Sequence, residues 1–229
     1  MAGDAVVLDL DDTLLDHRGS TRRALAGWLG DLGTRVEPSL ERAWFEVEDR
    51  HFDAWRAGLM GFEEQRRRRL RDFLPLLGHA VGSDDELDIA FAGYLAWYER
   101  SWLAFPDVRP ALDALVARGL VLAVLTNGRA EQQRAKVEAI GAAEAVAFVL
   151  TSEEVGAAKP APEAFLAACR RLGAPPHRVV HVGDRHDLDV VAARAAGLQA
   201  LHLDRHDLRL EPAEGRITSL TELPGRLRP

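Results

Sequence analysis

The chain of 229 residues has little cysteine, no excess of positive charge and only short apolar stretches. Its single cysteine, Cys169, excludes an internal disulfide and a cysteine-based zinc site. Twenty-nine basic and 36 acidic side chains give a formal net charge of −7, which disfavours a nucleic-acid polymer as partner. Apolar runs such as Leu120–Leu125 are far too short to span a bilayer, so we expect no membrane partner.

The beginning of the chain also lacks the features of a secretory signal. No basic residue precedes its first apolar stretch, and Asp9, Asp11 and Asp12 follow that stretch closely. Hydrophobic residues at 47% and charged residues at 28% are ordinary for a globular protein and exclude a disordered chain. We therefore expect a cytoplasmic protein, as a monomer or a homodimer.

Five short apolar runs without clean alternation are typical of parallel strands covered on both faces. They are Ala5–Leu10, Leu120–Thr126, Ala147–Thr151, Arg178–Val182 and Leu198–Leu203. Helix-like segments separate the last four runs, and each segment ends at a glycine, as at Gly173. The repeated order predicts an α/β fold with a doubly wound, Rossmann-like parallel sheet.

The interval 16–103 breaks this order, because it contains no convincing strand. It reads as four amphipathic helices, at about Thr21–Leu32, Ser39–Ala57, Phe62–Leu77 and Asp84–Trp102. All five tryptophans lie in this interval, which indicates a core of its own. We predict an inserted α-helical domain at 16–103, with the α/β core formed by 1–15 and 104–229.

Polar residues follow four of the predicted strands, where ligands bind in an open parallel sheet. In chain order they are Asp9 and Asp11, then Thr126, Asn127 and Gly128, then Lys159, then Asp184 and Asp189. Carboxylates brought together repel one another unless a cation compensates them. A hard, oxygen-preferring ion such as Mg²⁺ fits, with Asp9 and Asp184 as natural ligands. Asp9 and Asp11 share a site only if the chain bends between them, since residues two apart in a strand point to opposite faces.

These residues resemble the four motifs of the haloacid dehalogenase-like hydrolases, in order. The motifs are Asp9-Leu10-Asp11-Asp12-Thr13, Thr126-Asn127-Gly128, Lys159-Pro160 and the spacing from Gly183 to Asp189. The helical insertion resembles the cap of the subfamily with a cap between the first two motifs. The resemblance implies a Mg²⁺-dependent phosphatase that acts on a small phosphorylated metabolite through an aspartyl-phosphate intermediate.

The resemblance also implies a role for each residue. Asp9 is the nucleophile, and Asp11 protonates the leaving group and then deprotonates water. Thr126, Asn127 and Gly128 hold the phosphoryl oxygens, and Lys159 neutralises the charge on Asp9 and the phosphate. Mg²⁺ binds Asp9, the backbone carbonyl of Asp11 and Asp184, with Asp189 ordering its water shell.

The stretches 126–133 and 152–160 look most like the pyrimidine nucleotidase and N-acylneuraminate 9-phosphatase branch of the family, which implies a nucleotide or sugar phosphate as substrate. A phosphoglycolate-type phosphatase, a phosphomutase and a 2-haloacid dehalogenase on the same scaffold stay open. So does a scaffold that binds a phosphorylated ligand or a partner protein without turnover.

Three further features favour structural interpretations. His181 precedes the Gly183 turn within a buried run and is interpreted as a core histidine. His186 is interpreted as a solvated loop residue. The run Arg66–Arg69 is interpreted as a solvated, salt-bridged helix face, because four consecutive helical residues point in all directions.

Overall fold

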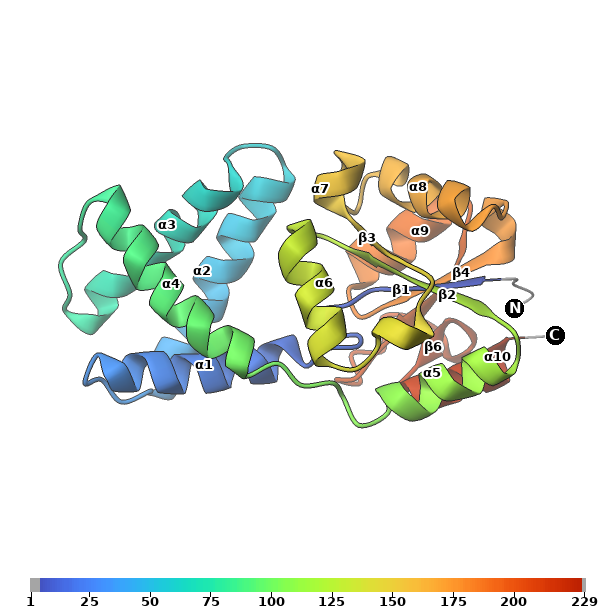
Figure 1. The fold of residues 1–229 in the computed structure, drawn as a ribbon, viewed down its shortest axis with the longest axis horizontal. Helices are drawn as coiled ribbons and strands as arrows, with labels where there is room; N and C mark the ends of the chain where they lie inside the picture. Colours follow the sequence, from blue (N-terminus) through green and yellow to red (C-terminus); the bar gives the residue numbers. More distant parts are fainter. Residues whose placement is uncertain (1–4, 228–229) are drawn as a thin grey trace. The chain divides into compact units, whose positions relative to one another are not determined.

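A computed structural model describes residues 5–227, and the chain divides into two compact units (Figure 1). One unit comprises Met1–His17 with Leu103–Pro229, and the other comprises Arg18–Trp102. We call them the α/β unit and the helical unit. Of the predicted core, residues 1–4 and 228–229 lie outside the described residues. Between residues 5 and 227, no helix combines the length and the hydropathy needed to cross a membrane.

The α/β unit is built on a six-stranded parallel sheet in the order β3-β2-β1-β4-β5-β6. The strands are β1 (Ala5–Leu8), β2 (Val121–Thr126), β3 (Val149–Thr151), β4 (Val179–Gly183), β5 (Gln199–Leu203) and β6 (Arg216–Ile217). β1 pairs with β2 on one side and with β4 on the other, so the strand order reverses there. All four residues of β1 are buried, which explains its lack of alternation. The predicted doubly wound α/β fold is confirmed.

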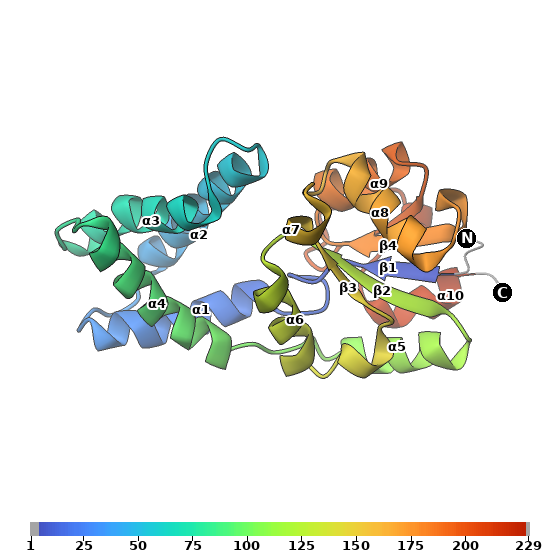
Figure 2. The same ribbon diagram turned by 45° about the horizontal axis from the view of Figure 1, so that its top comes forward.

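Helices cover both faces of this sheet (Figures 1 and 2). They are α5 (Val108–Ala117), α6 (Ala130–Ala139), α7 (Ser152–Val155), α8 (Pro162–Leu172), α9 (Ala192–Ala195) and α10 (Leu223–Arg226). α8 and α9 lie on one face, and α5 and α10 on the other. Phe165 and Cys169 of α8 pack with Val7 and Val179 in the buried core, so the lone cysteine fills space there. α8 ends at Gly173, whose φ of +66° suits glycine.

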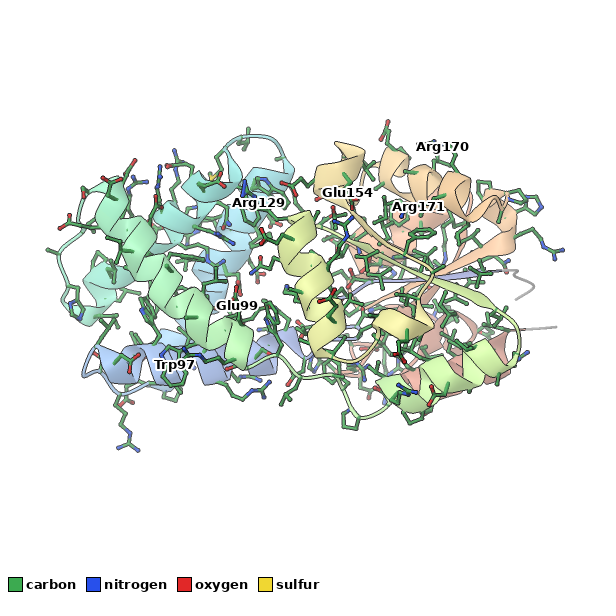
Figure 3. The ribbon with its side chains drawn as sticks, viewed as in Figure 1. Trp97, Glu99, Arg129, Glu154, Arg170 and Arg171 are labelled. Carbon is green, nitrogen blue, oxygen red and sulfur yellow. The ribbon has the colours of Figure 1, made fainter. Side chains whose placement is uncertain are left out.

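The helical unit contains α1 (His17–Asp31, which begins one residue before the unit), α2 (Pro38–Arg56), α3 (Phe62–Phe73) and α4 (Asp84–Arg100). Its core is aromatic: the Trp44 ring lies 4.5 Å from that of Tyr94 and 4.9 Å from that of Phe73, between ring centroids. Trp97 lies on α4 (Figure 3). It donates its indole N–H to Asp31, at the end of α1, at 2.7 Å. These contacts give the helical unit an interior of its own.

An ion pair ties the loop after β1 to later parts of the α/β unit. The Arg205 guanidinium donates to both carboxylate oxygens of Asp107, at 3.0 Å each, and to the carbonyl of Thr13 at 2.8 Å. Ser219 donates to the same Asp107 carboxylate at 2.8 Å. Both members of the ion pair are largely buried, so the contact persists in salt better than a surface pair.

Asp204, directly after β5, is a second buried carboxylate with a full set of donors. It accepts from the backbone N–H groups of Leu208 and Arg209 at 2.8 Å each, and from Arg216 Nε at 2.6 Å. Burial raises its pKa, but these donors outweigh burial and lower the pKa to about 2. The ionised form therefore stabilises the fold.

Replacing this carboxylate tests that contribution. Because the folded-state pKa lies below the usual value near 4, the stabilisation is complete above pH 4 and is lost as the pH falls through about 2. We expect Asp204→Asn to lower the free energy of unfolding by about 2 kcal/mol at pH 6, and the deficit to shrink toward pH 3. Urea unfolding at several pH values measures it. Asp49→Asn, at an exposed position, is the control; a deficit independent of pH contradicts the assignment.

Candidate active site

The loop that follows β1 closes a tight turn. The backbone N–H of Asp9 donates to Val182 of β4 at 2.9 Å, so Asp9 continues the parallel pairing by one residue. The carbonyl of Leu10 then accepts from the N–H groups of Leu14 and Leu15, both at 2.9 Å. The chain thus turns from Leu10 onward, so Asp9 and Asp11 do not continue one strand.

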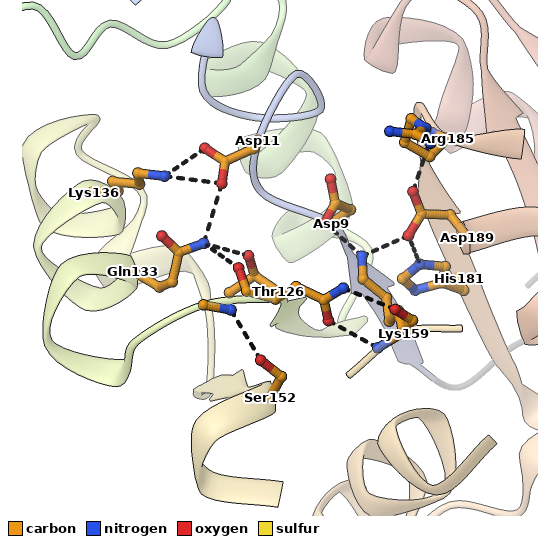
Figure 4. A network of polar contacts seen from close by, with 12 residues as sticks. Asp9, Asp11, Thr126, Gln133, Lys136, Ser152, Lys159, His181, Arg185 and Asp189 are labelled. Atoms are coloured by element: carbon orange, nitrogen blue, oxygen red, sulfur yellow. Dashed lines mark hydrogen bonds and ion pairs between the residues drawn. The ribbon is translucent and has the colours of Figure 1, made fainter. Parts of the chain in front are cut away.

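Lys159 joins two carboxylates in the interior (Figure 4). Its Nζ donates to Asp9 Oδ1 and to Asp189 Oδ1, both at 2.6 Å. The three residues are 3%, 7% and 1% exposed, respectively, so these are charge-assisted contacts shielded from water. Burial lowers the pKa of Lys159, but the two carboxylates outweigh it and raise that pKa above its ordinary value. Lys159 is therefore a permanent cation beside Asp9.

Asp189 is held from three sides. Besides Lys159, it accepts from His181 Nε2 at 3.0 Å and from the backbone N–H of Arg185 at 3.1 Å. It lies in a six-residue π-helical turn, His186–Val191, which replaces the start of the predicted helix. Burial raises the pKa of Asp189, but Lys159 and His181 outweigh it and lower that pKa, so the side chain is ionised.

Asn127 fixes the backbone of Lys159. Its side-chain amide donates to the Lys159 carbonyl at 2.9 Å and accepts from the Lys159 backbone N–H at 2.8 Å. Asn127 thereby fixes the position of the Lys159 backbone, and the Lys159 side chain reaches inward to Asp9. The Asn127 side chain is a structural support, which leaves its backbone N–H for any ligand contact.

Asp184, after β4, completes a group of acidic residues. Carboxylate oxygens of Asp9, Asp184 and Asp189 lie within 4.8 Å of one another. The buried Oδ1 of Asp184 has no hydrogen-bond partner within residues 5–227. Burial raises the pKa of Asp184 well above its usual value, and the charges of Asp9 and Asp189 raise it further. Burial likewise raises the pKa of Asp9 to about 7 despite Lys159.

The charge balance of this group fits a divalent cation. Three carboxylates face one ammonium, and the Asp184 oxygen points at no other donor. Oxygen ligands of this kind suit a hard cation such as Mg²⁺. Asp9 and Asp184 could hold such an ion, whereas Asp189 is already engaged by Lys159 and His181.

A second network lies beside the first (Figure 4). Lys136 Nζ donates to both oxygens of Asp11, at 2.7 and 2.9 Å. Gln133 Nε2 donates to Asp11 at 3.2 Å and to the hydroxyl of Thr126 at 2.6 Å. Burial raises the pKa of Asp11, but Lys136 and His17 outweigh it and lower that pKa. Asp11 is therefore ionised and held toward α6, with Gln133 linking it to the end of β2.

The structure brings together some of the predicted site residues and not others. Asp9, Lys159, Asp184 and Asp189 form one cluster. Asp11 and Thr126 belong to the adjoining network. The backbone N–H of Gly128 donates to the Ser152 hydroxyl at 3.0 Å. The N–H group of Gly128, which we predicted to hold a phosphoryl oxygen, thus already has a partner in this structure.

Sequence reasoning assigned no role to Gln133, Lys136 or His181 in this site. Gln133 and Lys136 are three residues apart on α6, so they share a helix face. That spacing, in a helix directly after Thr126, is the signal that could have identified them. His181 is fully buried, as predicted, and it also bonds to the site through Asp189.

Curated relatives cover most of the chain. A glyceraldehyde 3-phosphate phosphatase of Methanopyrus kandleri is 32% identical, over 88% of this chain and 84% of the relative. A phosphoserine phosphatase of Thermus thermophilus is 32% identical, over 95% and 96%. An (S)-2-haloacid dehalogenase of a Pseudomonas species is 29% identical, over 96% and 94%.

A solved structure of a HAD-hydrolase has a similar fold. The solved structure of a HAD-hydrolase from Bacillus subtilis, described as bound to magnesium, superposes with a TM-score of 0.82 at 20% identity, covering 97% of each chain. The family model for haloacid dehalogenase-like hydrolases matches residues 4–197, from the start of β1 past the end of α9. That range contains all of the carboxylate–lysine cluster. The chain belongs to the haloacid dehalogenase-like hydrolases.

Proposed function

We propose that the protein is a Mg²⁺-dependent phosphatase of a small phosphorylated metabolite, with Asp9 as the nucleophile. The observation that carries this proposal is the buried contact of Lys159 with Asp9, 2.6 Å long, next to the unpaired oxygen of Asp184. We assign the Asp9 oxygen that accepts from Lys159 to the contact with the cation as well, and the other Asp9 oxygen to the attack on phosphorus. The Asp9 oxygen bonds to phosphorus and gives an aspartyl phosphate, a mixed anhydride, while the bond from phosphorus to the leaving oxygen breaks and the alcohol departs.

Mg²⁺ would be held by the carboxylates of Asp9 and Asp184 and by the backbone carbonyl of Asp11. When bound, it supplies positive charge beside the phosphoryl oxygens. Asp189 orients Lys159 and orders the surroundings of the ion from outside. Thr126, through its hydroxyl, and Asn127, through its backbone N–H, hold the phosphoryl oxygens.

Asp11 is assigned two proton transfers. It gives a proton to the leaving oxygen, and it later takes one from the water that attacks phosphorus and hydrolyses the aspartyl phosphate. The ionised Asp11, paired with Lys136, is ready for the second transfer. The first transfer requires a proton on Asp11, which the charge of an approaching phosphate dianion favours by raising its pKa.

The helical unit is proposed to act as a cap that sets substrate specificity, since the α/β unit supplies the reacting groups. We keep a nucleotide or sugar phosphate as the substrate class, and the relative named for glyceraldehyde 3-phosphate supports the sugar phosphate. The pyrimidine nucleotidase and N-acylneuraminate 9-phosphatase branch and a cytoplasmic location remain predictions.

A 2-haloacid dehalogenase is the competing chemistry, with Asp9 attacking carbon. A halide leaves without a proton, so that reaction has no use for Asp11 as an acid. It also has no use for the cation that we assign to the carboxylates of Asp9 and Asp184. Both side chains therefore support the phosphatase.

Substitution of the nucleophile tests the reaction. In Asp9→Asn, the amide cannot form the aspartyl phosphate, so Mg²⁺-dependent phosphate release from p-nitrophenyl phosphate should fall at least about 10⁴-fold. Asp187→Asn is the matched control, because this acidic side chain lies in the π-helical turn after β4 and is 68% exposed. Undiminished activity in Asp9→Asn refutes the assigned nucleophile. Chloride release from 2-chloropropionate, in place of phosphate release, would identify a dehalogenase.

Asp11→Asn separates the two proton transfers. Nitrophenolate leaves without a proton, so formation of the aspartyl phosphate should survive, whereas hydrolysis of the aspartyl phosphate should slow by about 10²–10⁴-fold. Rapid mixing with p-nitrophenyl phosphate should then show a burst of nitrophenolate close to one per active site, followed by slow turnover. An unchanged steady rate without a burst contradicts the role of Asp11 as the base.

A further inference from the structure

His202 contacts the loop that carries Asp184. It lies on β5 opposite Gly183 of β4 and is 1% exposed. Its Nε2 lies 2.9 Å from the main-chain carbonyl oxygen of Asp184. A carbonyl only accepts hydrogen bonds, so Nε2 carries a proton and donates it. The other ring nitrogen, Nδ1, has no hydrogen-bond partner in the described part of the chain.

Other side chains hold this ring in place. The His186 ring packs edge-on against it, with 5.5 Å between ring centroids. His186 Nε2 lies 2.8 Å from Oε1 of Glu211, in the segment between β5 and β6. Arg194 of α9 contacts both oxygens of Glu211 at 2.9 Å and the carbonyl of Ala200 at 3.1 Å. We call His186, His202, Arg194 and Glu211 the histidine brace.

The histidine brace contacts the backbone that carries the Asp184 carboxylate. The Asp184 carboxylate oxygen Oδ1 has no hydrogen bond within the described chain, so its direction depends on the backbone that bears it. That backbone lies between the end of β4 and the π-helical turn. The hydrogen bond from His202 fixes the peptide plane directly after the Asp184 side chain. An ordinary buried histidine would fill space without contacting this peptide.

We propose that His202 is a positioning residue for the divalent cation and acts through the main chain of Asp184. Glu211, between β5 and β6, holds His186 and thereby supports the His202 ring. The inference rests on the metal site of the proposed function. Groups that orient metal ligands in this way typically affect metal affinity 10–100-fold when they are removed.

Calorimetric titration of the full chain with MgCl₂, without substrate, tests the proposal. His202→Phe keeps the ring but loses the N–H donor, and we expect the Kd for Mg²⁺ to rise about 10–100-fold. His202→Gln places an amide N–H near the former Nε2, and its Kd should return to within about threefold of the wild-type value. His206→Phe, at an exposed position just past β5, should leave Kd unchanged. Asp184→Asn should abolish binding.

Each result decides the matter. An unchanged Kd in His202→Phe, or a Kd in His202→Gln as weak as in His202→Phe, overturns the proposal while the metal site stands. Absence of Mg²⁺ binding by the wild-type chain overturns the metal site and this proposal together. If circular dichroism shows that His202→Phe does not fold, Glu211→Gln replaces it: a Kd raised about threefold supports the brace, and an unchanged Kd contradicts it.

Discussion

The site depends on one interaction, the buried contact of the Lys159 ammonium with the carboxylates of Asp9 and Asp189. A buried ion without a counter-ion costs several kcal/mol, so neither carboxylate could remain charged there without the lysine. Asp189 is further stabilised by His181 and by a backbone N–H group, which leaves Asp9 as the more reactive of the two. One buried cation thus creates an inert carboxylate and one suited to chemistry.

The sheet brings these charges together at low conformational cost. β1 and β4 are neighbours in parallel register, so Asp9 and Asp184 emerge from adjacent strand ends. Asn127, directly after β2, exchanges two hydrogen bonds with the backbone of Lys159 and so fixes a lysine that lies outside the described strands. The three carboxylates of Asp9, Asp184 and Asp189 face only the one ammonium of Lys159 among the described residues, which is the physical reason for assigning a metal there. A metal bound there would add its binding free energy to the stability of the same loops.

Much of the arrangement could be predicted from the sequence, because a short buried strand ends where its apolar run ends. That rule placed Asp9 and Asp184 at the carboxyl ends of their strands. It gave no means of finding Lys136, whose direction depends on how α6 is rotated about its axis. Nor could it find His202, which reaches the Asp184 carbonyl from the neighbouring strand β5. The same limit applies in the helical unit. Within Arg66–Arg69, predicted as a solvated face, Arg69 instead points inward and pairs with Glu48 at 2.6 Å while only 3% exposed.

The most direct test of the central claim is a crystal structure of the protein soaked with Mn²⁺, a divalent ion that accepts the same oxygen ligands and can be located by its anomalous signal. The account predicts one strong peak within about 2.5 Å of carboxylate oxygens of Asp9 and Asp184, with Lys159 still bound to Asp9. A structure in which this region carries no peak, or in which the ion binds only at surface carboxylates, contradicts it.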